Sequence, residues 1–183
     1  MGKVNRKIEY LEDYQHMLSR PNMYISSVEP MEEKIPIVED ERVIMKNKTF
    51  SQGMYRLVEE CIDNAFDELK RCISEKISMK KIEVIFNSKE NSIKVTDDGQ
   101  GFKDGIKKNS KTNLTNIETA MTKVRAGSNF NNDDTEVNLI GTNGIGISAA
   151  NVFSDMFRIE TRNSNSYYFQ EWEQFKSINK KIK

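Results

Sequence analysis

Three polar residues at helical spacing, Glu60, Asn64 and Asp67, are the residues of this chain whose types could do chemistry together. Apolar residues accompany them at the spacing of an amphipathic helix, at Met54, Leu57, Val58, Cys61, Ile62 and Ala65. The three polar side chains should therefore share one helix face. A glutamate can polarise a water molecule as a general base, and an asparagine oxygen suits a hard divalent cation. A solvated polar face is the plainer alternative for this cluster taken by itself.

The second group is the acidic, glycine-rich turn Asp-Asp-Gly-Gln-Gly at residues 97–101. Two alternating runs precede it, at residues 82–86 and 92–96, and their pattern predicts a β-hairpin that ends in this turn. A carboxylate at a strand end, here Asp97, can accept a hydrogen bond from an exocyclic amine such as that of adenine. Glycines beside it let a flat ring approach the backbone. An ordinary Asp-Gly turn is the alternative for this segment alone.

The third group is the glycine-rich segment Gly-Thr-Asn-Gly-Ile-Gly at residues 141–146, which leads into an apolar run with helical character. A glycine loop at a helix start offers backbone N–H groups and the positive end of the helix dipole, which together suit phosphate. It is not the P-loop pattern, because no Gly-Lys-Ser/Thr follows. On its own, such a loop is equally typical of a flexible connector.

Together and in this order, the three segments resemble the Bergerat-type ATP site of the GHKL ATPases. That family includes DNA gyrase, the type II DNA topoisomerases, the ninety-kilodalton heat-shock chaperones, the MutL mismatch-repair proteins and the histidine kinases. Its Glu-x-x-x-Asn, Asp-x-Gly-x-Gly and terminal Gly-x-Gly motifs are all present. The resemblance implies ATP and Mg²⁺ as ligands, with Glu60 as the base that activates the hydrolytic water and Asn64 holding magnesium. It also implies that Asp97 binds the adenine amine and that residues 144–146 wrap the phosphates. The nucleotide contacts implied in this way are Asn64, Asp67, Asp97, Gly99, Gly101, Ser128, Asn129, Gly141, Asn143, Gly144, Ile145 and Gly146.

Other segments resemble the type II topoisomerase branch of that family. Residues 17–27 look like the "RPxMYIGS" signature near the start of the topoisomerase ATPase chains, and residues 50–57 look like their "FxPGLYKL" segment. Residues 126–130 and 151–154 are similar to the lid and the "NIFS" segment of the eukaryotic and T-even phage enzymes. The resemblance covers about residues 11–172. It implies an ATP-driven gate for DNA strand passage, which closes as a homodimer while the other domains or subunits of the full enzyme hold most of the DNA.

The sequence departs from the family pattern in a few places. Gln100 stands where Arg or Lys is frequent, which would remove a salt bridge to Glu68. After residue 172 the family continues with a Gly-Thr strand that closes the sheet, and then with a transducer domain whose lysine reaches the γ-phosphate. Neither is recognisable before Lys183. A stand-alone nucleotide-binding module with a regulatory or interaction role, which does not hydrolyse ATP, is therefore the alternative function.

Composition adds limits on domain number, partners and location. A chain of 183 residues is expected to form one domain. Lys+Arg and Asp+Glu both number 28, and this balance argues against a main DNA-binding surface, so the basic stretches at 103–111 and 176–183 are interpreted as solvated charge. No apolar run approaches the ~20 residues of a membrane span, and the polar N-terminus is unlike a signal peptide. Cys61 and Cys72 are too far apart to pair. The sequence thus predicts a protein that is not secreted and has no membrane partner, located in the cytoplasm, or in the nucleus or a viral factory if the source is eukaryotic or viral.

The elements expected to position these residues can be given as ranges. The sequence predicts a polar arm at 1–8 and a lid at 126–146. Helices are expected at 9–19, 51–73, 113–125 and 144–153, and hairpins at 35–46 and 81–96, with two final strands after the last helix. Helices on one face of a mixed, mostly antiparallel sheet make an α+β protein, a two-layer α/β sandwich of the Bergerat type.

Overall fold

The fold is seen in a computed structural model that describes residues 8–127, 139–141 and 144–183. Most of the predicted arm and lid lie outside these residues, and so do Ser128, Asn129 and Asn143. The described chain forms, in order, α1 (Asp13–Ser19), the 3-10 turn η1 (Pro21–Met23), β1 (Pro30–Glu39), β2 (Arg42–Ser51), α2 (Gln52–Ser74), β3 (Ile82–Asn87), β4 (Ser92–Asp97), α3 (Asn116–Thr122), α4 (Gly146–Val152), β5 (Met156–Arg162), β6 (Tyr167–Glu173) and β7 (Lys176–Ile182).

The strands pair in three antiparallel groups, β1–β2, β3–β4 and β5–β6–β7. The predicted α+β class is confirmed. The expected mixed sheet is corrected in one respect, because every strand pair in the described part of the chain is antiparallel and the three groups are not joined by a hydrogen-bonded ladder. Each pair consists of strands consecutive in the sequence, and a short turn between such strands favours antiparallel pairing.

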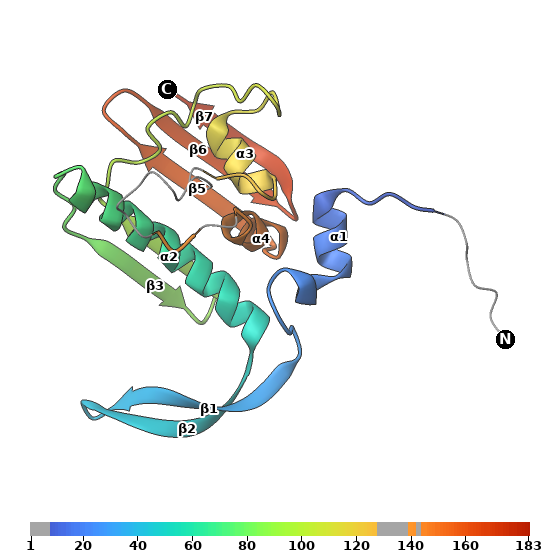
Figure 1. The fold of residues 1–183 in the computed structure, drawn as a ribbon, viewed down its shortest axis with the longest axis vertical. Helices are drawn as coiled ribbons and strands as arrows, with labels where there is room; N and C mark the ends of the chain where they lie inside the picture. Colours follow the sequence, from blue (N-terminus) through green and yellow to red (C-terminus); the bar gives the residue numbers. More distant parts are fainter. Residues whose placement is uncertain (1–7, 128–138, 142–143) are drawn as a thin grey trace.

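The helices cover one face of the strands, as the two-layer prediction requires. In Figure 1, α2 lies over β3 and β4, while α3 and α4 lie over the group β5–β6–β7. Ile117 and Met121 of α3 pack on Tyr168 and Trp172 of β6, and this cluster is buried. Burying these four side chains holds α3, the helix that leads toward the lid, against the sheet.

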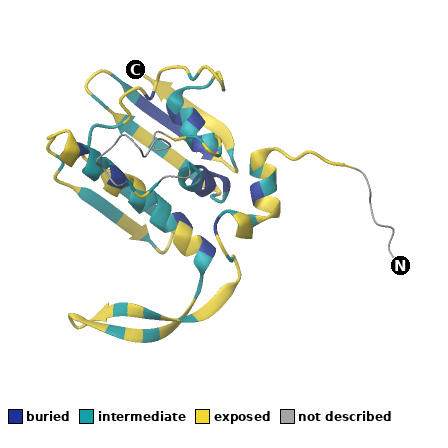
Figure 2. Ribbon diagram, in the orientation of Figure 1, coloured by how far each residue is buried: buried dark blue, intermediate teal, exposed yellow. Residues whose placement is uncertain are grey.

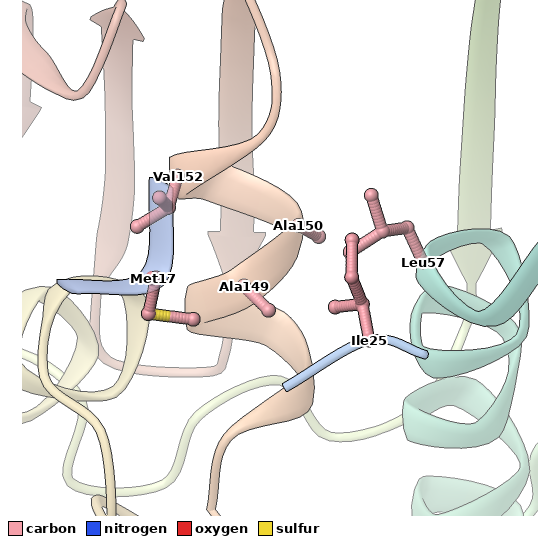
Figure 3. Packing of buried hydrophobic residues seen from close by; sticks show 6 residues of the cluster. All are labelled: Met17, Ile25, Leu57, Ala149, Ala150 and Val152. Atoms are coloured by element: carbon pink, nitrogen blue, oxygen red, sulfur yellow. The ribbon is translucent and has the colours of Figure 1, made fainter. Parts of the chain in front are cut away.

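A second apolar cluster joins α1, α2 and α4. Helix α4 has only seven residues, too few to be stable by propensity alone, yet its residues 148–152 are all buried. The small residues Ala149 and Ala150 let α4 approach its neighbours closely, as Figure 3 shows. Figure 2 shows the same concentration of buried residues on α4, in contrast to the exposed β1–β2 hairpin. The members of the cluster are Met17, Ile25, Leu57, Ala149, Ala150 and Val152.

The basic stretch at 176–183 is not a solvated tail, because most of it forms strand β7 on the edge of β6. Only two final strands were predicted, since lysines obscure any apolar alternation there. The turn between β6 and β7 consists of Gln174 and Phe175, both with positive φ (45° and 64°). Two positive φ values make the type I′ turn that suits a tight hairpin. Lysines are common on such exposed edge strands.

The other boundaries differ in length from the prediction. The first hairpin is longer than residues 35–46, because its ten-residue strands are closed by a turn at Asp40 and Glu41 with positive φ (49° and 59°). The first and third helices are shorter than predicted, at Asp13–Ser19 and Asn116–Thr122. No helix in the described residues is both long and apolar enough to span a membrane. Cys61 is half-buried, Cys72 is buried, and both are free thiols as predicted.

Candidate functional site

Helix α2 carries the first motif and is fixed at its start by its own cap. The Ser51 hydroxyl accepts a hydrogen bond from the backbone N–H of Met54 at 3.2 Å, which satisfies one of the free N–H groups of the first turn. Leu57 and Ala65 are buried among the core residues. This packing sets the rotation of α2 and therefore the direction of its polar face.

Glu60 lies directly against the start of α4. Its side chain is 16% exposed, and Arg56 one turn earlier forms an ion pair with it, Nη2 to Oε1, at 2.5 Å. A Cβ atom added at Gly146 would clash with the Glu60 carboxylate, so glycine at this position leaves the space that the carboxylate fills. Burial is the main cause that raises the pKa of Glu60, Arg56 opposes the shift, and the charge of Asp63 adds to it. The first and third motifs therefore meet at this carboxylate.

Asn64 is exposed one turn after Glu60. Its Nδ2 donates a hydrogen bond to the backbone oxygen of Glu60 at 2.6 Å. This bond turns the amide nitrogen toward the helix and directs the amide oxygen away from it. Among the described residues there is no group of three or more His, Cys, Asp and Glu side chains that could hold a metal ion. A divalent cation at Asn64 would therefore depend on ligand oxygens such as those of phosphates.

Asp67 has a different position from the one predicted for a nucleotide contact. The residue is 1% exposed, and its two carboxylate oxygens accept hydrogen bonds from the backbone N–H groups of Ile140 (2.7 Å) and Gly141 (2.8 Å). Lys70 lies 3.9 Å away. The geometry thus favours an anchor that fixes the end of the lid segment to α2. Sequence spacing gave the face of the helix but not the chain segment that covers it.

We expect Asp67→Ala to destabilise the fold by about 2–4 kcal/mol, because two buried backbone N–H groups lose their charged acceptor. Chemical denaturation followed by circular dichroism measures this change. Glu59→Ala on the same helix is the control. Its ion pair with Arg56 (3.4 Å) is at the surface, and its removal should cost less than about 0.5 kcal/mol. Equal losses in the two variants would contradict the anchoring role.

The second motif places Asp97 at the end of β4. Its Oδ1 accepts a hydrogen bond from the backbone N–H of Gly99 at 2.9 Å. The side chain is accessible to solvent, yet desolvation by the surrounding protein raises its pKa, with the Gly99 N–H opposing the shift and the charge of Glu68 adding to it. The next residue, Asp98, accepts hydrogen bonds from the backbone N–H groups of Lys80 and Lys81. The turn is thereby fixed to the start of β3.

The two glycines of this turn are required by close approach on both sides. A Cβ at Gly99 would lie 2.5 Å from the Cγ of Glu68 on α2. Gly101 has φ of 66°, and a Cβ there would lie 2.6 Å from the backbone oxygen of Arg162 on β5. The backbone N–H of Gln100 donates to Glu68 Oε1 at 2.9 Å. A main-chain hydrogen bond thus joins Glu68 to the turn in place of the side-chain salt bridge that the sequence lacks.

The described residues of the third motif form the root of the lid segment. The N–H of Ala126 donates to the oxygen of Gly144 at 3.3 Å, so the two ends of the segment meet. Gly144 has φ of 61°, which favours glycine. Ile145 precedes α4, and its oxygen accepts a hydrogen bond from the Ser148 hydroxyl at 2.8 Å. Gly141, Gly144, Ile145 and Gly146 are therefore all near α2 or the start of α4.

Helix α2 joins the three motifs. Glu60 contacts the start of α4, Asp67 holds the lid root, and Glu68 binds the turn after Asp97. Sequence reasoning missed the positioning roles of Glu68 and Arg56, although each lies four residues from a motif residue and so shares its helix face. Two surface hollows of about 500 and 340 Å³ lie elsewhere, around the β5–β6 turn.

Comparison with known proteins supports the resemblance of the motifs. No family model matches the chain. The crystal structure of the ATPase region of Saccharomyces cerevisiae topoisomerase II aligns with a TM-score of 0.85 and 31% identity, covering 96% of this chain and 46% of that structure. DNA topoisomerase 2 of Saccharomyces cerevisiae is 34% identical over 176 residues, which are 94% of this chain and 12% of that protein. A DNA gyrase polypeptide of Spiroplasma citri is 29% identical over 168 residues, 92% of this chain and 22% of that polypeptide.

The similarity extends over nearly all of this chain but over a small part of its relatives. The chain spans 12% of the length of the yeast protein and less than half of the matched crystal structure. Sequence and fold agree, because the same yeast enzyme is found by both comparisons. This chain is therefore a homologue of the type II DNA topoisomerases and has the fold of their ATPase region.

Proposed function

We propose that this chain binds and hydrolyses ATP as the ATP-driven gate of a type II DNA topoisomerase. The contact between the Glu60 carboxylate and Gly146 supports this most directly, because it places the expected base at the expected phosphate loop. Glu68 supports it further by joining the same helix to the adenine turn at residues 97–101. The similarity to the yeast ATPase region agrees with both contacts.

Glu60 would act as the general base for the attacking water. A base is most effective when its pKa lies near the working pH, and burial raises the pKa of Glu60 in that direction. Arg56 would hold the carboxylate in place through their ion pair. Asn64 would hold Mg²⁺, whose charge would offset that of the phosphate oxygens.

Asp97 would bind the adenine amine, with Gly99 and Gly101 leaving space for the ring. Residues 144–146 would contact the phosphates, together with Gly141 and the lid residues Ser128, Asn129 and Asn143. Asp67 would act indirectly, by holding the lid root on α2. A lid fixed at its root can close over a ligand without losing its register on the helix.

The partners follow from the relatives. The yeast homologue is about eight times longer than the matched segment, as its 12% coverage gives, so we propose further topoisomerase domains or subunits as partners. The gate would close as a homodimer and act on DNA through the full enzyme, in the cytoplasm, the nucleus or a viral factory. The alternative of a stand-alone module that does not hydrolyse ATP has less support, because the base is kept and positioned.

Calorimetry with a non-hydrolysable ATP analogue tests the ligand assignment. We expect the 183-residue chain to bind the analogue, and to bind it about tenfold more tightly with Mg²⁺ than with a chelator. Asn64→Ala should lose most of this Mg²⁺ effect, whereas Asn47→Ala, on the exposed β2 strand, should keep it. A folded parent that does not bind the analogue would contradict the ATP site, and Mg²⁺ dependence that survives in Asn64→Ala would contradict the role of Asn64.

A further inference from the structure

Two basic stretches that are far apart in the sequence meet at one end of the fold. Lys103, from the first stretch, lines the hollow of about 340 Å³. Arg162, Lys181 and Lys183 line the hollow of about 500 Å³. Figure 1 shows the β5–β6 turn, the loop after β4 and the end of β7 together at the end of the molecule opposite the β1–β2 hairpin.

Strand register places these cations on one surface. Arg162 is the cross-strand partner of Tyr167, and Tyr167 exchanges two backbone hydrogen bonds with Lys183 (2.8 and 3.0 Å). Lys181 pairs with Phe169 one row further along β6. Residues opposite each other, and residues two apart in a strand, share a face of the sheet. Tyr168 and Trp172 alternate with these residues and pack under α3, so the cations lie on the face that the helices leave open.

The larger hollow keeps an excess of positive charge. Its single carboxylate is Glu160, which accepts hydrogen bonds from Arg158 (3.1 Å) and from the Tyr167 hydroxyl (3.3 Å). The Glu160 charge is therefore largely offset by Arg158, which does not line the hollow. Because the whole chain has a formal net charge of zero, the gathering of cations here is a local feature of the fold.

The shape of the surface indicates an extended ligand. The two hollows are adjacent, because Asn163 and Asn165 line both of them. Asn163 is fixed by its own bonds, since its Nδ2 donates to the Phe102 oxygen (2.9 Å) and its Oδ1 accepts from the N–H of Asn165 (2.9 Å). The cations are thus distributed along a rigid surface and are not directed at a single point, an arrangement that suits a chain of phosphates.

The lining favours nucleic acid over protein. It consists of charged, amide and hydroxyl side chains with one aromatic ring and no aliphatic residue. Protein partners bury an apolar centre, whereas phosphodiester backbones are bound by Arg, Lys, Asn, Gln and Ser donors. We propose that Lys103, Arg162 and Lys181 bind the phosphodiester backbone of double-stranded DNA. This goes beyond the proposed ATP-driven gate, which does not require the chain itself to contact DNA.

Fluorescence anisotropy with a short labelled duplex tests the proposal without nucleotide, so its outcome is separate from that of the ATP site. The triple variant Lys103→Ala, Arg162→Ala, Lys181→Ala should bind at least about tenfold more weakly at low salt. It should also lose about 2–3 from the slope of log K against log salt. The control carries the same charge change on exposed lysines of other elements, Lys34→Ala, Lys48→Ala and Lys89→Ala, and should change affinity less than about twofold.

Three outcomes would overturn the proposal: a parent that does not bind the duplex, equal weakening in both triple variants, or polyglutamate that competes as well as unlabelled DNA. Circular dichroism checks that each variant is folded. The exposed single change Lys181→Glu gives a second test if the triple variant is unstable. It should weaken duplex binding more than Lys48→Glu, and equal effects would also overturn the assignment.

Discussion

Glu60→Gln should reduce the rate of ATP hydrolysis by about 10²–10⁴-fold while nucleotide affinity changes little, because it removes the general base and keeps its shape. The amide still fits the space beside Gly146 and can still bond to Arg56. Phosphate release measures the rate, and calorimetry with a non-hydrolysable analogue measures the affinity. Both are read on the full-length enzyme if the isolated chain turns over slowly.

Glu59→Gln is the matched control for this prediction. Glu59 is the preceding residue, it also pairs with Arg56 (3.4 Å), and its side chain is exposed. Its loss should change hydrolysis less than about threefold. If Glu60→Gln hydrolyses ATP at the parent rate, Glu60 is not the base.

The same residue sets an expected pH dependence of the parent. A general base works in its charged form, and burial raises the pKa of Glu60 above the ordinary value of 4.5. As pH falls, hydrolysis should therefore decline at a higher pH than an ordinary glutamate would give. The residual rate of Glu60→Gln should not show this decline.

Asp97→Asn should weaken nucleotide binding by about tenfold to hundredfold or more, because a hydrogen bond to a charged acceptor contributes about 1.5–3 kcal/mol. The asparagine oxygen can still accept the N–H of Gly99, so the turn should keep its shape. Calorimetry with the ATP analogue measures the loss. Inosine triphosphate, which lacks the amine, should bind the parent about as weakly as ATP binds the variant.

The neighbouring Asp98→Asn provides the comparison. Asp98 accepts hydrogen bonds from Lys80 and Lys81 and so fixes β3, a structural role that does not face a ligand. It should lower stability and leave nucleotide affinity within about threefold. Equal affinity losses in the two variants would show that the turn acts through its fold and that Asp97 does not bind the base.

The features that the sequence by itself determined are local. The amphipathic period placed Glu60, Asn64 and Asp67 on one face of a helix that spans Gln52–Ser74, and alternation predicted the hairpin before Asp97. The order of the three motifs was enough to indicate the family to which the chain is homologous. Such features follow from neighbours within a few residues, which is why they can be read without coordinates.

Only the tertiary structure decided which groups meet. It showed that Asp67 is covered by the N–H groups of residues 140 and 141, that Glu68 holds the turn after Asp97, and that residues 176–182 form a strand. It also brought Lys103 near Arg162 and Lys181. These contacts join segments up to about eighty residues apart. They depend on how α2, the lid root and the sheet pack together, and no local period of side chains encodes that packing.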